Sequence, residues 1–141
     1  MSGFTLHAQL AQDCAVIADA PLSQLLMMND AQYPWFILVP RVLGLREIYE
    51  LDVAGQQQLL AESVELGRAA MQAYAGDKLN VAALGNMVPQ LHLHHVVRNI
   101  GDAAWPAPVW GRHPALAYTP AQRSERVAAL RPLLGAGWRW L

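Results

Sequence analysis

Short apolar runs separated by turn residues dominate the first part of the chain and predict strands. Residues 14–18 and 22–28 form two such runs on either side of a proline-containing turn, which predicts a hairpin after a short helix at residues 6–12. Residues 35–39 are apolar without interruption and end at Pro40, a pattern typical of a strand buried on both faces. We therefore expect residues 35–39 to form a central strand.

One long amphipathic segment, residues 52–74, predicts the main helix. Apolar or small residues recur in it at four-three-four-three spacing, the spacing of one helix face: Leu60, Val64, Gly67, Met71 and Tyr74. Gly76 follows where a helix commonly ends. Residues 79–84 and 90–97 predict two further strands, the second because its residue types alternate at period two.

A capping motif begins the last predicted helix. Thr119 precedes Pro120 and is followed three residues later by Gln122, so a helix should run to about Arg131, before Pro132. Its buried positions would be Val127, Leu130 and Leu134. The elements together predict an α+β fold, an antiparallel sheet of about five strands with one long helix and a C-terminal helix.

Composition limits the classes of protein that the chain can belong to. Its 141 residues suit one domain spanning 1–141, and an apolar fraction of 54% beside a charged fraction of 15% favours a homo-oligomer. A net charge of −1, without charged blocks, gives no surface for nucleic acid or an anionic membrane. Cys14 is the single cysteine, and no signal or membrane-spanning pattern is visible, so we expect a cytoplasmic protein.

Tryptophan and proline are concentrated near the C-terminal end. Residues 105–111, Trp-Pro-Ala-Pro-Val-Trp-Gly, are too proline-rich for regular structure. We interpret them as a loop packed over the core or at a dimer seam, in preference to a substrate contact. Trp138 and Trp140 should likewise dock on the body of the protein or on a partner.

Three of the five histidines fall within residues 92–95. In a strand, alternate side chains share a face, so Gln90, His92 and His94 should line one surface and His95 the apolar opposite one. We interpret His95 as a core histidine bonded to a backbone carbonyl. Two imidazoles and an amide side by side have no packing purpose that apolar residues would not serve better, which indicates a functional site.

The polar face suits chemistry at phosphorus. One imidazole can attack while its neighbour holds a phosphate oxygen or passes a proton to the leaving group. Because the pKa of an ordinary histidine is near 6.5, a neutral imidazole and a protonated neighbour can coexist at neutral pH. Gln90 and Asn86 could donate hydrogen bonds to phosphoryl oxygens. A metal site using His92 and His94 is the competing hypothesis, but Gln90 is a poor third ligand.

Residues 90–96, Gln-Leu-His-Leu-His-His-Val, resemble the signature of the histidine triad (HIT) family, with glutamine at the first histidine position. Residues 84–89 resemble the polar turn that leads into that signature. Residues 29–40 resemble the nucleotide-binding strand pair of the family. The resemblance covers about residues 14–98, which leaves residues 99–141 as an extension expected to pack on the core or on a dimer partner.

The resemblance implies a homodimeric hydrolase or transferase of nucleotides that needs no metal or other cofactor. His92 would be the nucleophile that forms a nucleotidyl-histidine intermediate, and His94 a phosphate contact. Asn86 would lie near the phosphate or leaving group. Asp30, with Asn29, would bind ribose hydroxyls and Met28 would face the base, although Asn29 and Asp30 can equally form a plain turn.

The chain departs from the family pattern at three places. Gln90 removes one imidazole and leaves hydrogen bonding without proton transfer, His95 replaces an apolar residue, and Leu43-Gly44 stands where many relatives carry another histidine. The nucleophile position, His92, is kept despite these departures. We therefore still expect hydrolysis of dinucleoside polyphosphates or nucleoside phosphoramidates through His92. A nucleotide-binding protein with little turnover is the alternative, and a metal-dependent enzyme the third possibility.

Overall fold

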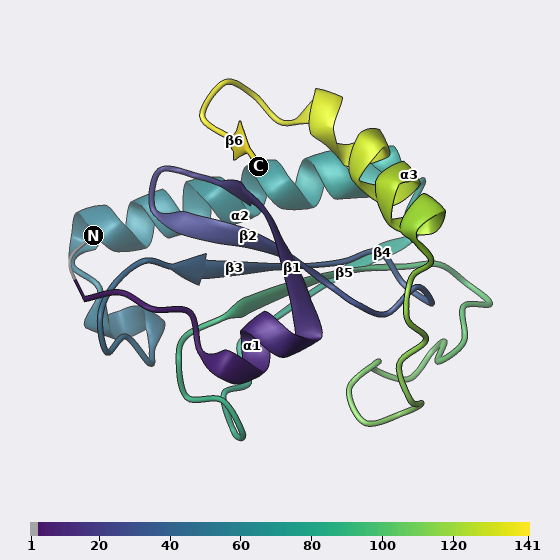
Figure 1. The fold of residues 1–141 in the computed structure, drawn as a ribbon, viewed down its shortest axis with the longest axis horizontal. Coiled ribbons are helices and arrows are strands. Elements are labelled where there is room, and N and C mark those ends of the chain that lie inside the picture. Colours follow the sequence, from purple (N-terminus) through teal and green to yellow (C-terminus); the bar gives the residue numbers. More distant parts are fainter. Residues whose placement is uncertain (1–2) are drawn as a thin grey trace.

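An antiparallel sheet forms the centre of the protein (Figure 1). The computed structural model describes residues 3–141, and within them the sheet has six strands in the order β4-β5-β3-β2-β1-β6. The strands are β1 (Cys14–Asp19), β2 (Ser23–Met28), β3 (Trp35–Pro40), β4 (Lys78–Ala82), β5 (Leu93–Arg98) and β6 (Arg139–Trp140). Every neighbouring pair is antiparallel, as the sequence predicts.

The helices divide between the two faces of the sheet. Their bounds are α1 (Ala8–Asp13), α2 (Val53–Ala73) and α3 (Pro120–Leu130), with short 3-10 turns η1 (Ile48–Glu50) and η2 (Arg131–Leu133). Side chains from α2 and α3 pack on one face in the larger apolar cluster, and Leu10 of α1 belongs to the cluster on the other face. The α+β class is therefore confirmed.

Local sequence signals explain where the helices begin. Asp52 caps α2 by accepting the N–H of Gly55 at 2.7 Å. Thr119 and Gln122 form the reciprocal capping box of α3, with bonds of 3.2 and 2.9 Å. Within that last segment Leu130 and Leu134 are buried and Val127 packs against the same cluster.

The expected buried stripe of the long helix is partly wrong. Leu60 and Val64 are 65% and 50% exposed, whereas the sheet-facing residues are Leu59, Glu62, Leu66, Gly67, Ala69 and Ala70. Gly67 lies at the margin of the buried face, where a Cβ would be 2.7 Å from Leu79 Cδ2 of β4. Leu60 and Val64 lie farther round the helix from the buried residues and remain exposed.

Strand β3 is the central strand that its apolar run predicts. All six of its residues are buried, and it pairs with β2 on one side and β5 on the other. The pairing places Ile37 opposite His94. The strand predicted at residues 90–97 is shorter than expected and begins at Leu93, so Gln90 and His92 lie in the extended segment that precedes it.

The chain after β5 packs on both faces of the sheet. Ala104 and Val109 join the cluster that contains Leu10, and Trp138 joins the cluster beneath α2. Trp140 pairs with Ala18 as part of β6. No helix within residues 3–141 is both long and apolar enough to cross a membrane.

Candidate active site

His92 and His94 lie side by side at the start of β5. Their ring centroids are 4.9 Å apart and their planes are inclined at 65°. His92 is 8% exposed and His94 4% exposed, so both rings are largely withdrawn from water. The sequence prediction that these two imidazoles share one surface is therefore met by the geometry.

A backbone carbonyl orients the ring of His92. Nδ1 lies 2.7 Å from the carbonyl oxygen of Gln90, and because a carbonyl can only accept, Nδ1 carries the proton. The lone pair of neutral His92 is therefore on Nε2. This is the tautomer that a nitrogen nucleophile acting through Nε2 requires.

An indole fixes the opposite tautomer of His94. Nε1 of Trp35 donates to Nδ1 of His94 at 2.9 Å, so Nδ1 holds a lone pair and Nε2 carries the proton of the neutral ring. Burial, followed by the neighbouring His92 and His95, lowers the pKa of His94 to about 3. The expectation of a protonated neighbour is therefore wrong for His94, which is a neutral hydrogen-bond donor at neutral pH.

The side chain of Gln90 is turned toward the N-terminal segment. Its Oε1 accepts the backbone N–H of His7 at 2.8 Å, and its Nε2 donates to the carbonyl of Thr5 at 2.9 Å. We expected this amide to serve a phosphoryl group. Gln90 instead contacts the histidine pair through its backbone carbonyl, which accepts from Nδ1 of His92.

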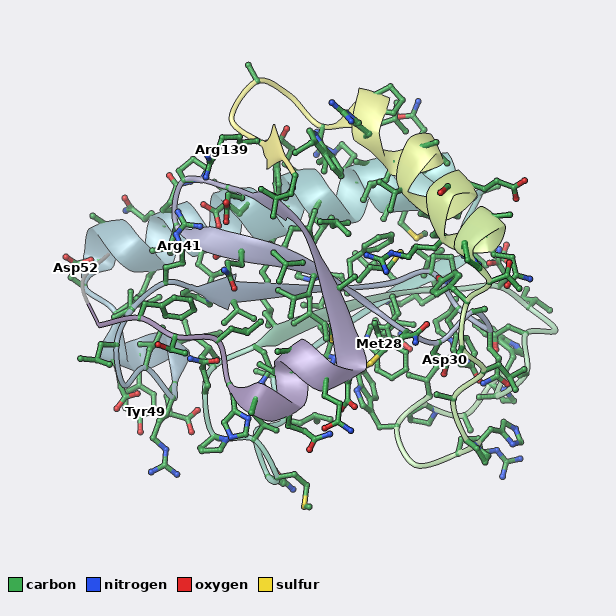
Figure 2. The ribbon with its side chains drawn as sticks, viewed as in Figure 1. Met28, Asp30, Arg41, Tyr49, Asp52 and Arg139 are labelled. Atoms are coloured by element: carbon green, nitrogen blue, oxygen red, sulfur yellow. The ribbon has the colours of Figure 1, made fainter. Side chains whose placement is uncertain are left out.

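Met28, Asn29 and Asp30 line one cavity of about 380 Å³ at the end of β2. Figure 2 labels Met28 and Asp30 at this end of the sheet. Trp35 and Trp110 also line the cavity, and both contact His94: Trp35 by its hydrogen bond, and Trp110 edge-on with ring centroids 5.4 Å apart. The cavity is thus next to the histidine pair, and the indole rings of Trp35 and Trp110 lie between them.

Asp30 is buried beside that cavity, at 4% exposure. Its Oδ1 accepts the N–H groups of Gln32 and Leu116 and the side-chain amide of Gln32, all within 3.3 Å. Asn29 accepts the N–H of Tyr118 at 2.9 Å through its own Oδ1. Both residues therefore form the turn that the sequence allowed as the plain alternative, and they also line a cavity. Among the described residues, Oδ2 of Asp30 has no hydrogen-bond donor.

Asn86 lies in the exposed turn before the histidines, and within residues 3–141 its side chain has no hydrogen-bond partner. The structure thus does not bring it into contact with His92. A narrow cleft does lie beside His92, and Arg46 and Glu47 line it together with Gln90. Sequence reasoning missed Arg46, because it lies on the loop after β3, more than forty positions from the histidines.

His95 occupies the opposite face, as predicted. It is fully buried, its Nδ1 donates to the carbonyl of Leu93 at 3.0 Å, and Oγ of Ser63 in α2 lies 2.7 Å from its Nε2. The backbone carbonyl was expected, and the serine was not. Ser63 was missed because nothing in the sequence relates a residue of the long helix to one particular strand position.

The tryptophan-rich segment packs on the core, as expected, and one of its residues also lines the cavity. Val109 is buried in the apolar cluster, as a loop packed on the core requires. Trp110 lines the cavity and contacts both Trp35 and His94. The indole N–H of Trp110 is buried and has no hydrogen-bond partner among the described residues.

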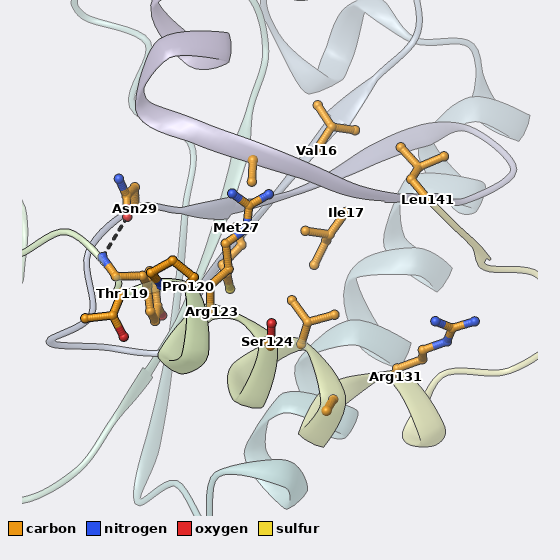
Figure 3. Close-up of a pocket in the computed structure, with 14 residues that line it drawn as sticks. Val16, Ile17, Met27, Asn29, Thr119, Pro120, Arg123, Ser124, Arg131 and Leu141 are labelled. Carbon is orange, nitrogen blue, oxygen red and sulfur yellow. Dashed lines mark hydrogen bonds between the residues drawn. The ribbon is translucent and has the colours of Figure 1, made fainter.

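A larger cavity lies elsewhere in the part of the chain that the structure describes. It has about 710 Å³ between β1 and α3 and is lined by Ile17, Arg123 and Arg131, among others (Figure 3). Asn29 is at one end of it, bonded to the N–H of Tyr118. None of its lining residues is a histidine, whereas Trp35 and Trp110 of the smaller cavity contact His94 directly. Residues 3–141 contain no cluster of three or more His, Cys, Asp or Glu side chains placed to hold a metal.

Comparison with known proteins identifies the family. The HIT domain profile matches residues 9–100, and the chain therefore belongs to the HIT, or histidine triad, family. Membership places it in a superfamily of nucleotide-binding hydrolases and transferases. No curated protein sequence matches the chain.

Solved structures of histidine triad proteins resemble it over nearly their whole length. One from Marinobacter aquaeolei VT8 is 55% identical, with a TM-score of 0.92 over 94% of this chain and 97% of its own. One from Bradyrhizobium japonicum is 45% identical, with the same TM-score over 94% and 99%. A third, from Sinorhizobium meliloti 1021, is 36% identical, with a TM-score of 0.92 over 95% and 99%.

The two buried histidines predict a loss of stability in mild acid. Burial lowers the pKa of His95 to about 4, and that of His94 is about 3, whereas the unfolded chain takes up these protons near 6.5. The contribution of the neutral rings to the free energy of unfolding is fully present above pH 6.5 and declines below it. Each ring contributes a slope of about 1.4 kcal/mol per pH unit. Urea unfolding between pH 6.5 and pH 4 measures this slope.

One variant separates this effect from general acid sensitivity. His95→Gln removes the buried ring and should reduce the slope by about one proton. An unfolding free energy that stays constant over the first pH unit below 6.5 would contradict the prediction.

Proposed function

We propose that the protein hydrolyses or transfers nucleotides at a phosphate through a nucleotidyl intermediate on His92. The observation that carries the proposal is the pair of opposite tautomers: a lone pair on Nε2 of His92 beside an N–H on Nε2 of His94. A nucleophile and a neutral donor next to each other suit attack on a phosphoryl group whose oxygens need hydrogen bonds.

The cavity beside the pair suits the nucleoside. Oδ2 of Asp30 would accept ribose hydroxyls, with Asn29 forming the turn, and Met28 would contact the base beside the indoles of Trp35 and Trp110. The phosphate would then lie toward His92 and His94. Gln90 would orient His92 through its carbonyl, and Asn86, on its exposed turn, would meet the leaving group.

A substrate panel tests the proposal. The purified protein is incubated with dinucleoside polyphosphates and with adenosine phosphoramidate, and release of nucleoside monophosphate is measured against His92→Ala. We expect release from at least one member. A rate no greater than that of His92→Ala on every member would overturn the proposal.

A nucleotide-binding role with little turnover is the second candidate. Glutamine at position 90 leaves only two imidazoles in the triad, and the observation that favours this candidate is that the Gln90 amide is bonded to Thr5 and His7 rather than free to contact a phosphate. Calorimetric binding of AMP or GMP without turnover on the panel would support this candidate, and failure to bind any nucleotide would remove both.

We also propose that the protein is a homodimer. Leu60 and Val64 expose apolar surface along α2, beside a shallow cavity of about 610 Å³, and Val81 is 47% exposed on the edge strand β4. A second copy would bury both features. Light scattering should give twice the 15.5 kDa of one chain, and Leu60→Glu with Val64→Glu should give a monomer. A monomeric wild type would contradict this.

A further inference from the structure

Neither histidine of the pair is placed to give a proton to a leaving group, because Nδ1–H of His92 faces the Gln90 carbonyl and the indole N–H of Trp35 faces Nδ1 of His94 and opposes its protonation. We propose that the protein therefore cleaves bonds whose leaving group departs as a stable oxyanion, such as phosphate or polyphosphate, and discriminates against the amine leaving group of a phosphoramidate. This inference rests on the proposed function, since it concerns which substrates the His92 site accepts.

Trp35 prevents His94 from acting as an acid. Its indole N–H can only donate, and it points at Nδ1 of His94 from 2.9 Å. A protonated His94 would place two N–H groups against each other at a site that is 4% exposed. That arrangement loses a buried hydrogen bond and leaves a charge without a partner. His94 thus donates a hydrogen bond through Nε2 but does not surrender a proton there.

The other members of the site do not replace the missing acid. An amide such as Gln90 does not ionise, and both ends of this one are bonded to the N-terminal segment. The N–H of His92 is held by the Gln90 carbonyl, and its Nε2 is the atom that would bond to phosphorus. Of the residues lining the cleft beside His92, Glu47 is the one carboxyl group, and its side chain is exposed.

The bond changes show why the leaving group matters. Nε2 of His92 forms a bond to phosphorus while the bond from phosphorus to the leaving oxygen breaks, and that oxygen takes the electron pair. A phosphate or polyphosphate oxygen holds this charge without a proton, whereas an amine nitrogen must be protonated before it leaves. Water then attacks phosphorus, its proton passes to solvent, and the pair of the broken N–P bond returns to Nε2.

The first experiment compares two substrates on the unmodified protein. We expect kcat/KM for diadenosine tetraphosphate to exceed that for adenosine phosphoramidate by about 100-fold or more, the usual contribution of a general acid. Comparable values that both disappear in His92→Ala would overturn this inference and leave the proposed function intact. If neither substrate is cleaved, the proposed function itself is overturned.

The second experiment uses two tryptophan variants. Trp35→Phe removes the N–H that faces Nδ1 of His94, so a proton on that nitrogen would no longer meet a second N–H, and the preference for the anhydride should fall at least about tenfold. Trp110→Phe removes an indole N–H beside the same ring that has no partner among the described residues, and should keep the preference. Equal preferences in the two variants would overturn the role assigned to Trp35.

A further variant covers the remaining carboxyl group. Glu47→Gln should leave the ratio of the two kcat/KM values unchanged. A selective loss of phosphoramidate cleavage in Glu47→Gln would identify this residue as an acid and overturn the inference. Should Trp35→Phe fail to fold, as thermal unfolding would show, the substrate comparison on the unmodified protein still decides.

Discussion

Replacing His92 by alanine should lower kcat for nucleotide hydrolysis by at least about 10⁴-fold, as removal of a catalytic nucleophile does in other enzymes. The reason is that Nε2 of His92 has a lone pair available for attack, whereas Nε2 of His94 holds a proton. Steady-state release of nucleoside monophosphate measures the loss.

His94→Ala is the matched comparison for that prediction. It removes a hydrogen-bond donor and leaves the nucleophile, so its kcat should fall by about 10²-fold to 10³-fold, as for loss of one donor to a developing charge. Binding of AMP to His92→Ala, followed by calorimetry, should persist because the cavity at Met28 and Asp30 is not altered. Similar losses in the two variants would contradict the assignment of His92.

Much of the fold could be predicted because the signals are local. The apolar run of β3 and the capping box of α3 each depend on neighbouring residues, and the observed bounds lie within two residues of those expected. The face of α2 could not be predicted in the same way. The buried face is set by contacts with distant segments, of which the close approach of Gly67 to Leu79 is one, and spacing along the helix does not reveal them.

The candidate site likewise has features that the local sequence predicts and features that depend on distant segments. Alternation within residues 90–97 placed His92 beside His94 and placed His95 on the other face. The partners that determine the chemistry came from elsewhere: Trp35 lies on another strand, and the N-terminal segment takes up the Gln90 amide. A residue type shows that an imidazole is present, but its tautomer follows from what the fold brings to each nitrogen.

Asp102→Ala should destabilise the protein by about 3–5 kcal/mol, because it leaves a buried guanidinium without its counter-charge. Arg98 is 2% exposed, and its Nε and Nη2 donate to the two carboxylate oxygens of Asp102 at 2.9 Å each. Burial acts to raise the pKa of Asp102, but the hydrogen bonds from Arg98 and from the Asn99 N–H lower it overall. The carboxylate is therefore ionised in the folded state and is bonded to Arg98 through both of its oxygens.

The same carboxylate holds the segment that carries Trp110. Oδ1 of Asp102 also accepts the N–H of Trp105 at 2.8 Å, and the Arg98 guanidinium lies over the Trp105 ring, 5.6 Å from its centroid. Loss of Asp102 should thus loosen the loop that brings Trp110 against His94. The affinity for AMP should fall together with stability, which calorimetry and urea unfolding measure on the same sample.

Asp19→Ala is the control for that stability change, because it also removes ion pairs formed by one aspartate. Asp19 bonds Arg41 at 3.3 Å and Arg139 at 2.9 Å, but these arginine side chains are 23% and 79% exposed. Ion pairs in contact with water contribute about 1 kcal/mol or less, so Asp19→Ala should unfold close to the wild-type midpoint. Equal destabilisation by the two variants would show that burial of Arg98 does not set the cost. Asp102 would then act through its hydrogen bonds to the backbone of the loop.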